Sequence, residues 1–320
     1  MSRLLVVSAL LAACSSSTGT DTSPTDSGDS AVVDPNGDPT TVPLNGMCPL
    51  ESRWGGFEAE ANESYSVVDG EVANGVVPLT ILEQTLSEGD CKLLKRNNPY
   101  CDPPCGTEET CDFDGECIPY PENQDVGTVT VGGLTESVSM EPTSNRNYFF
   151  TKLSNPAFTP GKLIELKSTG GAYTPITLHG VGVAPLVPTS TDWIITAGQP
   201  LQVAWDAPTA AVRSEVSLSV NVDQHGLTPA TLVCSFVDDG AAEVPSSVMD
   251  ALLGSGVSGY PSATMQRRTA DKAMLGSGCV DFVVDYEVLA HVSVTGHTPC
   301  SGPNDCPEGQ ECNMALQTCE

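Results

Sequence analysis

Residues 280–288 read Val-Asp-Phe-Val-Val-Asp-Tyr-Glu-Val, and their apolar side chains recur at every second position. Residues 216–222, Val-Ser-Leu-Ser-Val-Asn-Val, repeat this pattern. Successive side chains of a strand point to opposite faces, so a period of two indicates a strand with one buried face. Shorter alternations at 201–205 and 232–236 are separated by turn residues. These patterns predict a mainly β fold, a β-sandwich over residues 123–297.

A hairpin and two short helices complete the expected β fold. Weak alternation over residues 57–77 predicts the hairpin. Thr80-Ile-Leu-Glu83 has the form of a capping box, and Gly89 would end the helix that it starts. The second helix is expected at Ser246–Leu253, with Gly254 as its stop.

The sequence holds 13 cysteines, which is an odd number. Without Cys14 an even number remains, and in an exported protein this indicates disulfide bonds. The candidates for disulfide bonds are Cys48, Cys91, Cys101, Cys105, Cys111, Cys117, Cys234, Cys279, Cys300, Cys306, Cys312 and Cys319. Zinc is the alternative, but zinc ribbons favour two close C-x₂₋₄-C pairs, and most spacings here are wider. We therefore expect disulfides, with no metal ion and no cofactor.

Two short segments, residues 101–117 and 300–319, share the spacing C-x₃₋₅-C-x₅-C-x₅₋₆-C. Segments of this size bury too little apolar surface to fold alone, so covalent bridges must hold them. Four cysteines permit three pairings, and sequence alone does not choose among them. The pattern resembles EGF-like and Dickkopf-type cysteine-rich modules. This resemblance implies first-to-third and second-to-fourth pairing, and a role as spacer or contact surface.

The other four candidates lie outside these modules. Cys234 and Cys279 each stand at an expected strand, and we expect them to form a bridge within the sandwich. Cys48 and Cys91 bracket the hairpin and the first helix, so a bridge between them would tie this piece together.

The N-terminus has the layout of an export signal. Arg3 precedes an apolar run of about ten residues, too short for a membrane span of about 20. Leu11-Ala12-Ala13-Cys14 resembles the lipobox of bacterial lipoproteins, although an ordinary signal peptide is the alternative. The resemblance implies cleavage before Cys14 and a diacylglycerol on its thiol, and two or three acyl chains anchor a protein firmly. Ser15 at the next position, instead of Asp, favours the outer membrane.

Six segments follow from these observations. They are a signal peptide (1–13), a disordered tether rich in Ser, Thr, Asp, Gly and Pro (14–46), a β-hairpin and helix segment (47–98), a cysteine-rich module (99–122), the sandwich (123–297) and a C-terminal cysteine-rich module (298–320). Because β pattern flanks the first module on both sides, it reads as an insertion within one larger β domain.

The chain is strongly acidic, with a formal net charge of −28. This charge argues against a nucleic-acid partner, which requires basic patches. The acidic residues are spread along the chain, which favours a solvated acidic surface. Calcium is the alternative, since the acidic runs 34–38 and 112–116 alternate, but neither continues to the distal Glu of an EF-hand loop.

The motifs of common catalytic sites are absent from the sequence. It has no H-E-x-x-H, G-x-S-x-G, S-x-x-K, G-x-x-x-x-G-K or G-x-G-x-x-G. Its four histidines, His179, His225, His291 and His297, have no helical ligand spacing.

Several polar or aromatic residues have both a functional and a structural interpretation. Asp238-Asp239 and Asp250 are candidates for paired carboxylates, against a simple turn after a strand. Arg267-Arg268 could bind an anion, although a solvated turn is favoured. Trp193 and Trp205 are expected to be core residues rather than platforms for a ligand.

Residues 48–297 also resemble a set of cysteine-rich bacterial lipoproteins. The resemblance rests on Gly70–Gly75, Asn98–Cys101, Gly127–Leu134 and Cys234–Gly240. It brings no assigned activity and no functional residues.

The expected function is that of a membrane-anchored protein of the cell envelope, with a structural or recognition role and no catalysis. Its partners would be the membrane, through the lipid on Cys14, and an unknown protein or glycan. One alternative is a carbohydrate- or polymer-binding module, although aromatic residues make up only 5% of the chain. The other is a hydrolase with a composite site of Asp, Glu and His.

Overall fold

The structure is a computed structural model that describes residues 41–209, 213–223 and 230–320. The expected signal peptide, Cys14, most of the expected tether, the acidic run 34–38 and His225 lie outside the described residues.

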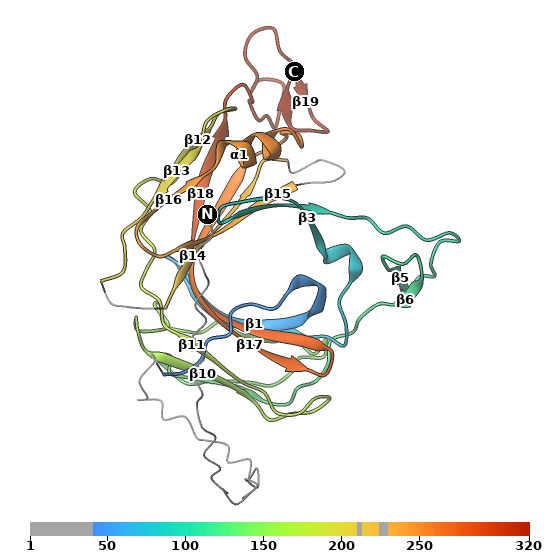
Figure 1. The fold of residues 1–320 in the computed structure, drawn as a ribbon, viewed down its shortest axis with the longest axis vertical. Helices are drawn as coiled ribbons and strands as arrows, with labels where there is room; N and C mark the ends of the chain where they lie inside the picture. Colours follow the sequence, from blue (N-terminus) through green and yellow to red (C-terminus); the bar gives the residue numbers. More distant parts are fainter. Residues whose placement is uncertain (1–40, 210–212, 224–229) are drawn as a thin grey trace, which may run out of the picture. The chain divides into compact units, whose positions relative to one another are not determined.

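Ten of the described strands form one large sheet (Figure 1). In spatial order they are β3 (Leu82–Glu88), β4 (Cys91–Arg96), β15 (Ala230–Val237), β14 (Glu215–Asn221), β17 (Ser262–Leu275), β18 (Gly278–Val294), β1 (Arg53–Ala61), β2 (Ser66–Val72) and β9 (Tyr148–Phe150), with β12 (Asp192–Ile195) paired to β18. β1 and β12 run parallel to β18, and the other neighbours are antiparallel.

The remaining described elements cover the large sheet or form the small modules. A four-stranded sheet has the order β11 (Thr177–Val181), β10 (Leu163–Ser168), β7 (Val129–Gly132) and β8 (Val138–Met140), and a two-stranded sheet joins β13 (Leu201–Ala204) to β16 (Ala241–Val244). The modules hold the pairs β5 (Glu109–Cys111) with β6 (Cys117–Pro119) and β19 (Cys312–Asn313) with β20 (Thr318–Cys319). The helical elements are α1 (Ser246–Leu253) and the 3₁₀ turns η1 (Leu50–Ser52) and η2 (Pro78–Thr80).

Two hydrophobic cores lie on one face of the large sheet. The first core packs β4, β14 and β15 against β13, β16 and α1, and the second packs β1 and β2 against the four-stranded sheet. The long hairpin β17–β18 contributes to both, with Met265 and Val292 in the first core and Phe282 and Val284 in the second. Even-numbered residues of β18 serve both cores, so both lie on the same face. The mainly β, layered fold is therefore confirmed.

One of the two expected helices is wrong. The segment after Thr80 forms strand β3, which pairs with β4 across a turn at Gly89. Gly89 has a φ of +57°, so the glycine interpreted as a helix stop supplies the left-handed residue of a hairpin turn. The side chain of Thr80 accordingly donates to Val77 O within the 3₁₀ turn instead of capping a helix.

The other expected elements are present. The helix α1 spans Ser246–Leu253, is followed by Gly254, and buries Val248, Met249 and Leu252. The hairpin expected over residues 57–77 is β1–β2. Within the described residues, no helix is long and apolar enough to cross a membrane.

The six disulfides match four expected pairings and correct the other two. The modules pair Cys101–Cys111, Cys105–Cys117, Cys300–Cys312 and Cys306–Cys319, which is the first-to-third and second-to-fourth pattern. The expected Cys234–Cys279 and Cys48–Cys91 bridges are wrong, because the bonds are Cys48–Cys279 and Cys91–Cys234. Cys234 points into the first core, whereas Cys279 stands on the opposite face of the same sheet.

Candidate functional site

The face of the large sheet opposite the two cores, here called the open face, carries many acidic side chains. Residues that are paired in register on neighbouring strands project from the same face of the sheet. Glu58 is thus opposite Asp69, and Glu60 is opposite Asp285. The charged residues of the open face on β1, β2, β14, β17 and β18 are Arg53, Glu58, Glu60, Asp69, Glu71, Glu215, Arg268, Lys272, Asp281, Asp285 and Glu287.

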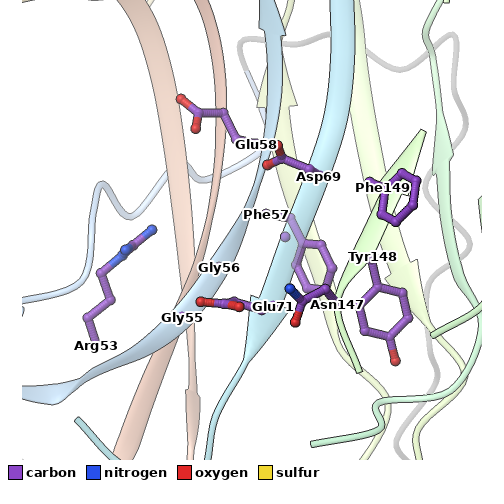
Figure 2. Close-up of a pocket in the computed structure, with 11 residues that line it drawn as sticks. Arg53, Gly55, Gly56, Phe57, Glu58, Asp69, Glu71, Asn147, Tyr148 and Phe149 are labelled. Carbon is purple, nitrogen blue, oxygen red and sulfur yellow. The ribbon is translucent and has the colours of Figure 1, made fainter. Parts of the chain in front are cut away.

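A pocket of about 430 Å³ opens on this face, over β1, β2 and β9 (Figure 2). Its floor is low at Gly56, where a Cβ would stand 2.2 Å from Asp281 Oδ1. Gly70 faces the core side, in register with Phe57, and a Cβ there would stand 2.4 Å from both Gly56 O and the Phe57 ring. Figure 2 shows Glu58 on β1 beside Asp69 on β2. The pocket therefore combines close backbone packing below with carboxylates above.

Two aspartates of β18 on the open face are equally buried but differ in their partners. Asp281 is 0% exposed, and its carboxylate accepts from Arg53 Nε at 3.0 and 3.1 Å and from Cys48 N at 3.1 Å. Asp285 is also 0% exposed, but neither of its oxygens has a hydrogen-bond partner among the described residues. Arg268 stands opposite Asp285 but bonds to Glu215, with Nε 2.8 Å from Oε1.

Burial and like charge together raise the pKa values of this acidic group. Burial first, and then the charges of Glu60, Asp69 and Glu287, raise the pKa of Glu58 to about 7. The pKa of Asp285 lies well above its ordinary value, because of burial and then the charges of Glu58, Glu60 and Glu287. The ionised forms repel one another in a poorly hydrated place, so the group favours binding protons or another cation.

No sequence motif singles out these carboxylates. The available signal was a pair of acids two residues apart on each of two strands, Glu58 with Glu60 and Asp285 with Glu287, because this spacing places both acids on one face. Nothing local indicates that β1 and β18 are neighbours, since they lie more than 200 residues apart.

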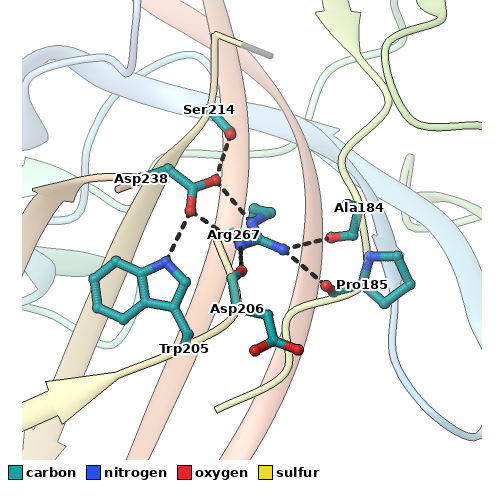
Figure 3. A network of polar contacts seen from close by, with 7 residues as sticks. All are labelled: Ala184, Pro185, Trp205, Asp206, Ser214, Asp238 and Arg267. Atoms are coloured by element: carbon teal, nitrogen blue, oxygen red, sulfur yellow. Dashed lines mark hydrogen bonds and ion pairs between the residues drawn. The ribbon is translucent and has the colours of Figure 1, made fainter. Parts of the chain in front are cut away.

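Arg267 is a structural residue (Figure 3) and not part of a solvated turn. It is 1% exposed, and its guanidinium binds both oxygens of Asp238, at 2.8 and 3.0 Å, and the backbone carbonyls of residues 184, 185 and 206. Asp238 also accepts from Trp205 Nε1 at 2.8 Å and from Ser214 Oγ at 2.6 Å. Burial alone would raise the pKa of Asp238, but these hydrogen bonds lower it. Arg268 faces the other way, on the open face.

The other acidic candidates bind backbone groups of their own surroundings. Asp250 accepts a hydrogen bond from Gly198 N at 2.6 Å and takes no part in the Asp238 network. In the first module, Asp112 accepts the backbone N–H groups of Asp114 and Glu116 and closes the turn between β5 and β6. These carboxylates have structural roles, and the structure does not bring them together as a catalytic pair.

The described histidines lie apart from the acidic group of the open face. His179 lies 3.6 Å from Asp271 in the layer of the two cores, and His297 Nε2 contacts a backbone carbonyl at 2.8 Å. His291 is exposed and stands about 20 Å along β18 from Asp285, at roughly 3.3 Å per residue.

The two tryptophans that were considered as platforms for a ligand are core residues, as expected. Trp193 and Trp205 are 7% and 4% exposed, and each belongs to the first core.

A search with protein-family models and among curated proteins found no match for this chain. The interpretation of the open face therefore rests on its own chemistry, which is a set of crowded carboxylates with one buried member that has no hydrogen bond.

Replacing Asp285 by Asn is expected to stabilise the protein above neutral pH. A carboxyl group whose pKa is raised on folding binds more protons in the folded state, so stability is highest at low pH and falls as pH rises through the folded pKa. For Glu58 this pH window runs from 4.5 to about 7. The charged groups that act on Glu58 or Asp285 from the surrounding strands are Glu60, Asp69, Glu287, Arg53 and Arg268. At about pH 8 we expect Asp285→Asn to raise the melting temperature by on the order of 2–5 °C.

The control is Asp281→Asn, which changes the same residue type on the same strand and face. This substitution removes the charge paired with Arg53 and replaces one of the two oxygens that accept from Arg53 and Cys48 N by an NH₂ donor, so it should lower stability by about 1–3 kcal/mol. Thermal unfolding followed by circular dichroism between about pH 5 and 8 separates the two effects. A melting temperature that falls equally in both variants would contradict this account of Asp285.

Neighbouring arginines should differ strongly in their contribution to stability. Arg267→Ala leaves the Asp238 carboxylate buried without its cation, and we expect a loss of about 3–5 kcal/mol. Arg268→Ala removes a partly exposed pair with Glu215 and should change stability by less than about 1 kcal/mol. Urea denaturation measures both, and similar small losses would show that the buried network is dispensable.

Proposed function

We propose that this chain is an exported bacterial lipoprotein, held at the outer membrane by lipid on Cys14. The observation that carries the proposal is that all twelve other cysteines pair with one another in six disulfides. Disulfides on this scale are typical of an oxidising compartment outside the cytosol. They leave Cys14 as the remaining cysteine of the sequence, at the end of a lipobox-like segment.

The anchored part has a recognition role, and the open face is its recognition surface. Both cores occupy one side of the large sheet, while the pocket of Figure 2 opens on the other. We infer binding rather than catalysis because the described histidines lie away from the carboxylates and the described cysteines are oxidised to disulfides. The two cysteine-rich modules serve as spacers or additional contact surfaces.

Positive charge is the chemistry that best complements the pocket. Glu58, Asp69 and Glu71 line it, and the one cationic side chain in its lining, Arg53, is bound to Asp281. A basic segment of a partner protein would relieve the repulsion among these carboxylates and gain charge-assisted hydrogen bonds.

A glycan is the second candidate, and one observation favours it. Phe149 on β9 lies opposite Asp69 on the open face, lines the pocket and is 58% exposed. An exposed aromatic ring beside carboxylate and amide groups offers an apolar surface for a sugar ring and acceptors for its hydroxyl groups.

The anchor is tested by replacing Cys14 with Ala. We expect the variant to leave the membrane fraction and to accumulate with its signal still attached, because no thiol remains for the lipid. Fractionation of cells and mass spectrometry of the N-terminus measure both effects, and Cys14→Ser serves as a second variant. A variant that stays membrane-bound and is processed normally would show that the lipobox interpretation is wrong.

The recognition surface is tested with a fluorescent oligolysine peptide and a glycan array. The double variant Asp69→Asn, Glu71→Gln should weaken peptide binding at least tenfold, because it removes two negative charges without changing the size of the side chains. Asp192→Asn, an exposed acid on β12, is the matched control and should bind as the wild type does.

Phe149→Ala separates the two candidates. It should leave peptide binding within about twofold and abolish any signal on the glycan array, since a stacked ring contributes to sugar binding and a point charge does not need it. Failure of the wild type to bind either probe would argue against the open face as the recognition surface.

A further inference from the structure

Asp285 carries a carboxylate in the middle of the large sheet, on β18 between β17 and β1. Its side chain is fully shielded from solvent, and neither oxygen has a hydrogen-bond partner among the described residues. A buried ionised carboxylate without a partner is strongly destabilising, so the group either holds a proton or is compensated by an ion or ligand. Arg268 opposite Asp285 lowers the pKa of Asp285 less than burial and the neighbouring carboxylates raise it, and its guanidinium is bound to Glu215.

Three glutamates surround this aspartate on the same face. Glu60 is opposite Asp285 on β1, Glu58 is two residues before Glu60, and Glu287 is two residues after Asp285. Glu58, Glu60 and Glu287 are also the residues whose negative charges act on Asp285. Four carboxylates from two adjacent parallel strands therefore lie on one patch of the sheet.

Neighbouring polar groups each bind one carboxylate oxygen of two of these glutamates. Tyr65 donates its hydroxyl to Glu60 Oε1 at 2.8 Å, and Gln266 Nε2 donates to Glu287 Oε2 at 3.3 Å. Each of these glutamates keeps a second oxygen that can take part in another interaction. Hydrogen bonds of this kind orient ligand carboxylates in metal sites.

We propose that Asp285, Glu58, Glu60 and Glu287 form a binding site for a calcium ion on the open face of the large sheet. Ca²⁺ takes six to eight oxygen ligands, and four carboxylates with their second oxygens and water supply that number. Carboxylate oxygens are hard ligands, which suit Ca²⁺ better than zinc or copper. This site is separate from the acidic runs of the sequence, and it requires neither the lipid anchor nor a macromolecular partner.

The ion draws its ligands together. Among the described residues, the ligand atoms that already converge in groups of three are cysteine sulfurs of the two modules, and those sulfurs are in disulfides. The glutamate side chains must therefore rotate toward Asp285, which is fixed by its burial. Such flexible closure fits Ca²⁺, whereas Mg²⁺ demands near-ideal octahedral geometry and releases its water reluctantly. We expect a dissociation constant of about 10⁻⁴–10⁻³ M, as in extracellular calcium modules.

The test is thermal unfolding of the purified full-length chain at neutral pH, after treatment with a chelator, with CaCl₂, MgCl₂ or NaCl at equal ionic strength. At a calcium concentration of about 100 times the dissociation constant, the wild type should melt about 5 °C higher, and the shift should saturate. MgCl₂ should give less than half of that shift, and NaCl essentially none. Isothermal titration calorimetry with CaCl₂ gives the stoichiometry, which we expect to be one strong site per chain.

Asp285→Asn removes the central ligand and should abolish the calcium-dependent shift, even though its melting temperature without calcium is raised. Asp192→Asn, on β12 at the edge of the sheet, is the matched control and should keep the whole shift. Glu287→Gln keeps the buried aspartate and should weaken calcium binding at least tenfold, so the site remains testable if Asp285→Asn folds poorly. An equal calcium shift in wild type, Asp285→Asn and Glu287→Gln, or no saturable shift in the wild type, would overturn the proposal.

Discussion

The fold depends on the sharing of one long hairpin, β17–β18, by two hydrophobic cores. Between the parts of β17 that enter the two cores, Arg267, Thr269 and Asp271 interrupt its apolar alternation, and all three are buried. Their side chains bind backbone groups of residues 179–185, which include the end of β11 and the segment that follows it out of the four-stranded sheet. Buried polar groups must find partners, so these three side chains hold the end of β11 and the following segment against β17.

The open face exists because the two cores share the β17–β18 hairpin. Because both cores are built on one side of the sheet, the alternate residues of the same strands must project to the other side. There the described chain places carboxylates on β1, β2 and β18, while the basic residues Arg53 and Arg268 are engaged by Asp281 and Glu215. Strand pairing thus collects charges that are far apart in the sequence, and it sets the location of the pocket and of the acidic group.

Period-two alternation predicted the layered β fold and strands such as those at 216–222 and 280–288, because burial of one face leaves apolar residues at alternate positions. It did not predict β17, where buried polar residues interrupt the apolar alternation. The helix at Thr80 was wrong because a capping box is a local pattern, and pairing of β3 with β4 outweighed it. The bridge of Cys234 to Cys279 was wrong because strand alternation alone does not say which face of a shared sheet a residue occupies. The site was missed for a related reason, since an acid within a strand looks like an ordinary solvent-facing residue until its neighbour is known.

Asp281 and Asp285 show what the structure adds to the sequence. They lie four residues apart on one strand and one face, and both are inaccessible to solvent. Around Asp281 the fold supplies a guanidinium and a backbone amide, brought there by the disulfide of Cys48 to Cys279 and by the start of β1. Around Asp285 the described chain supplies three more carboxylates and directs the nearest arginine elsewhere. The fold is evidently able to neutralise a buried aspartate at this depth, so the unneutralised one marks the place where stabilisation comes from outside the chain.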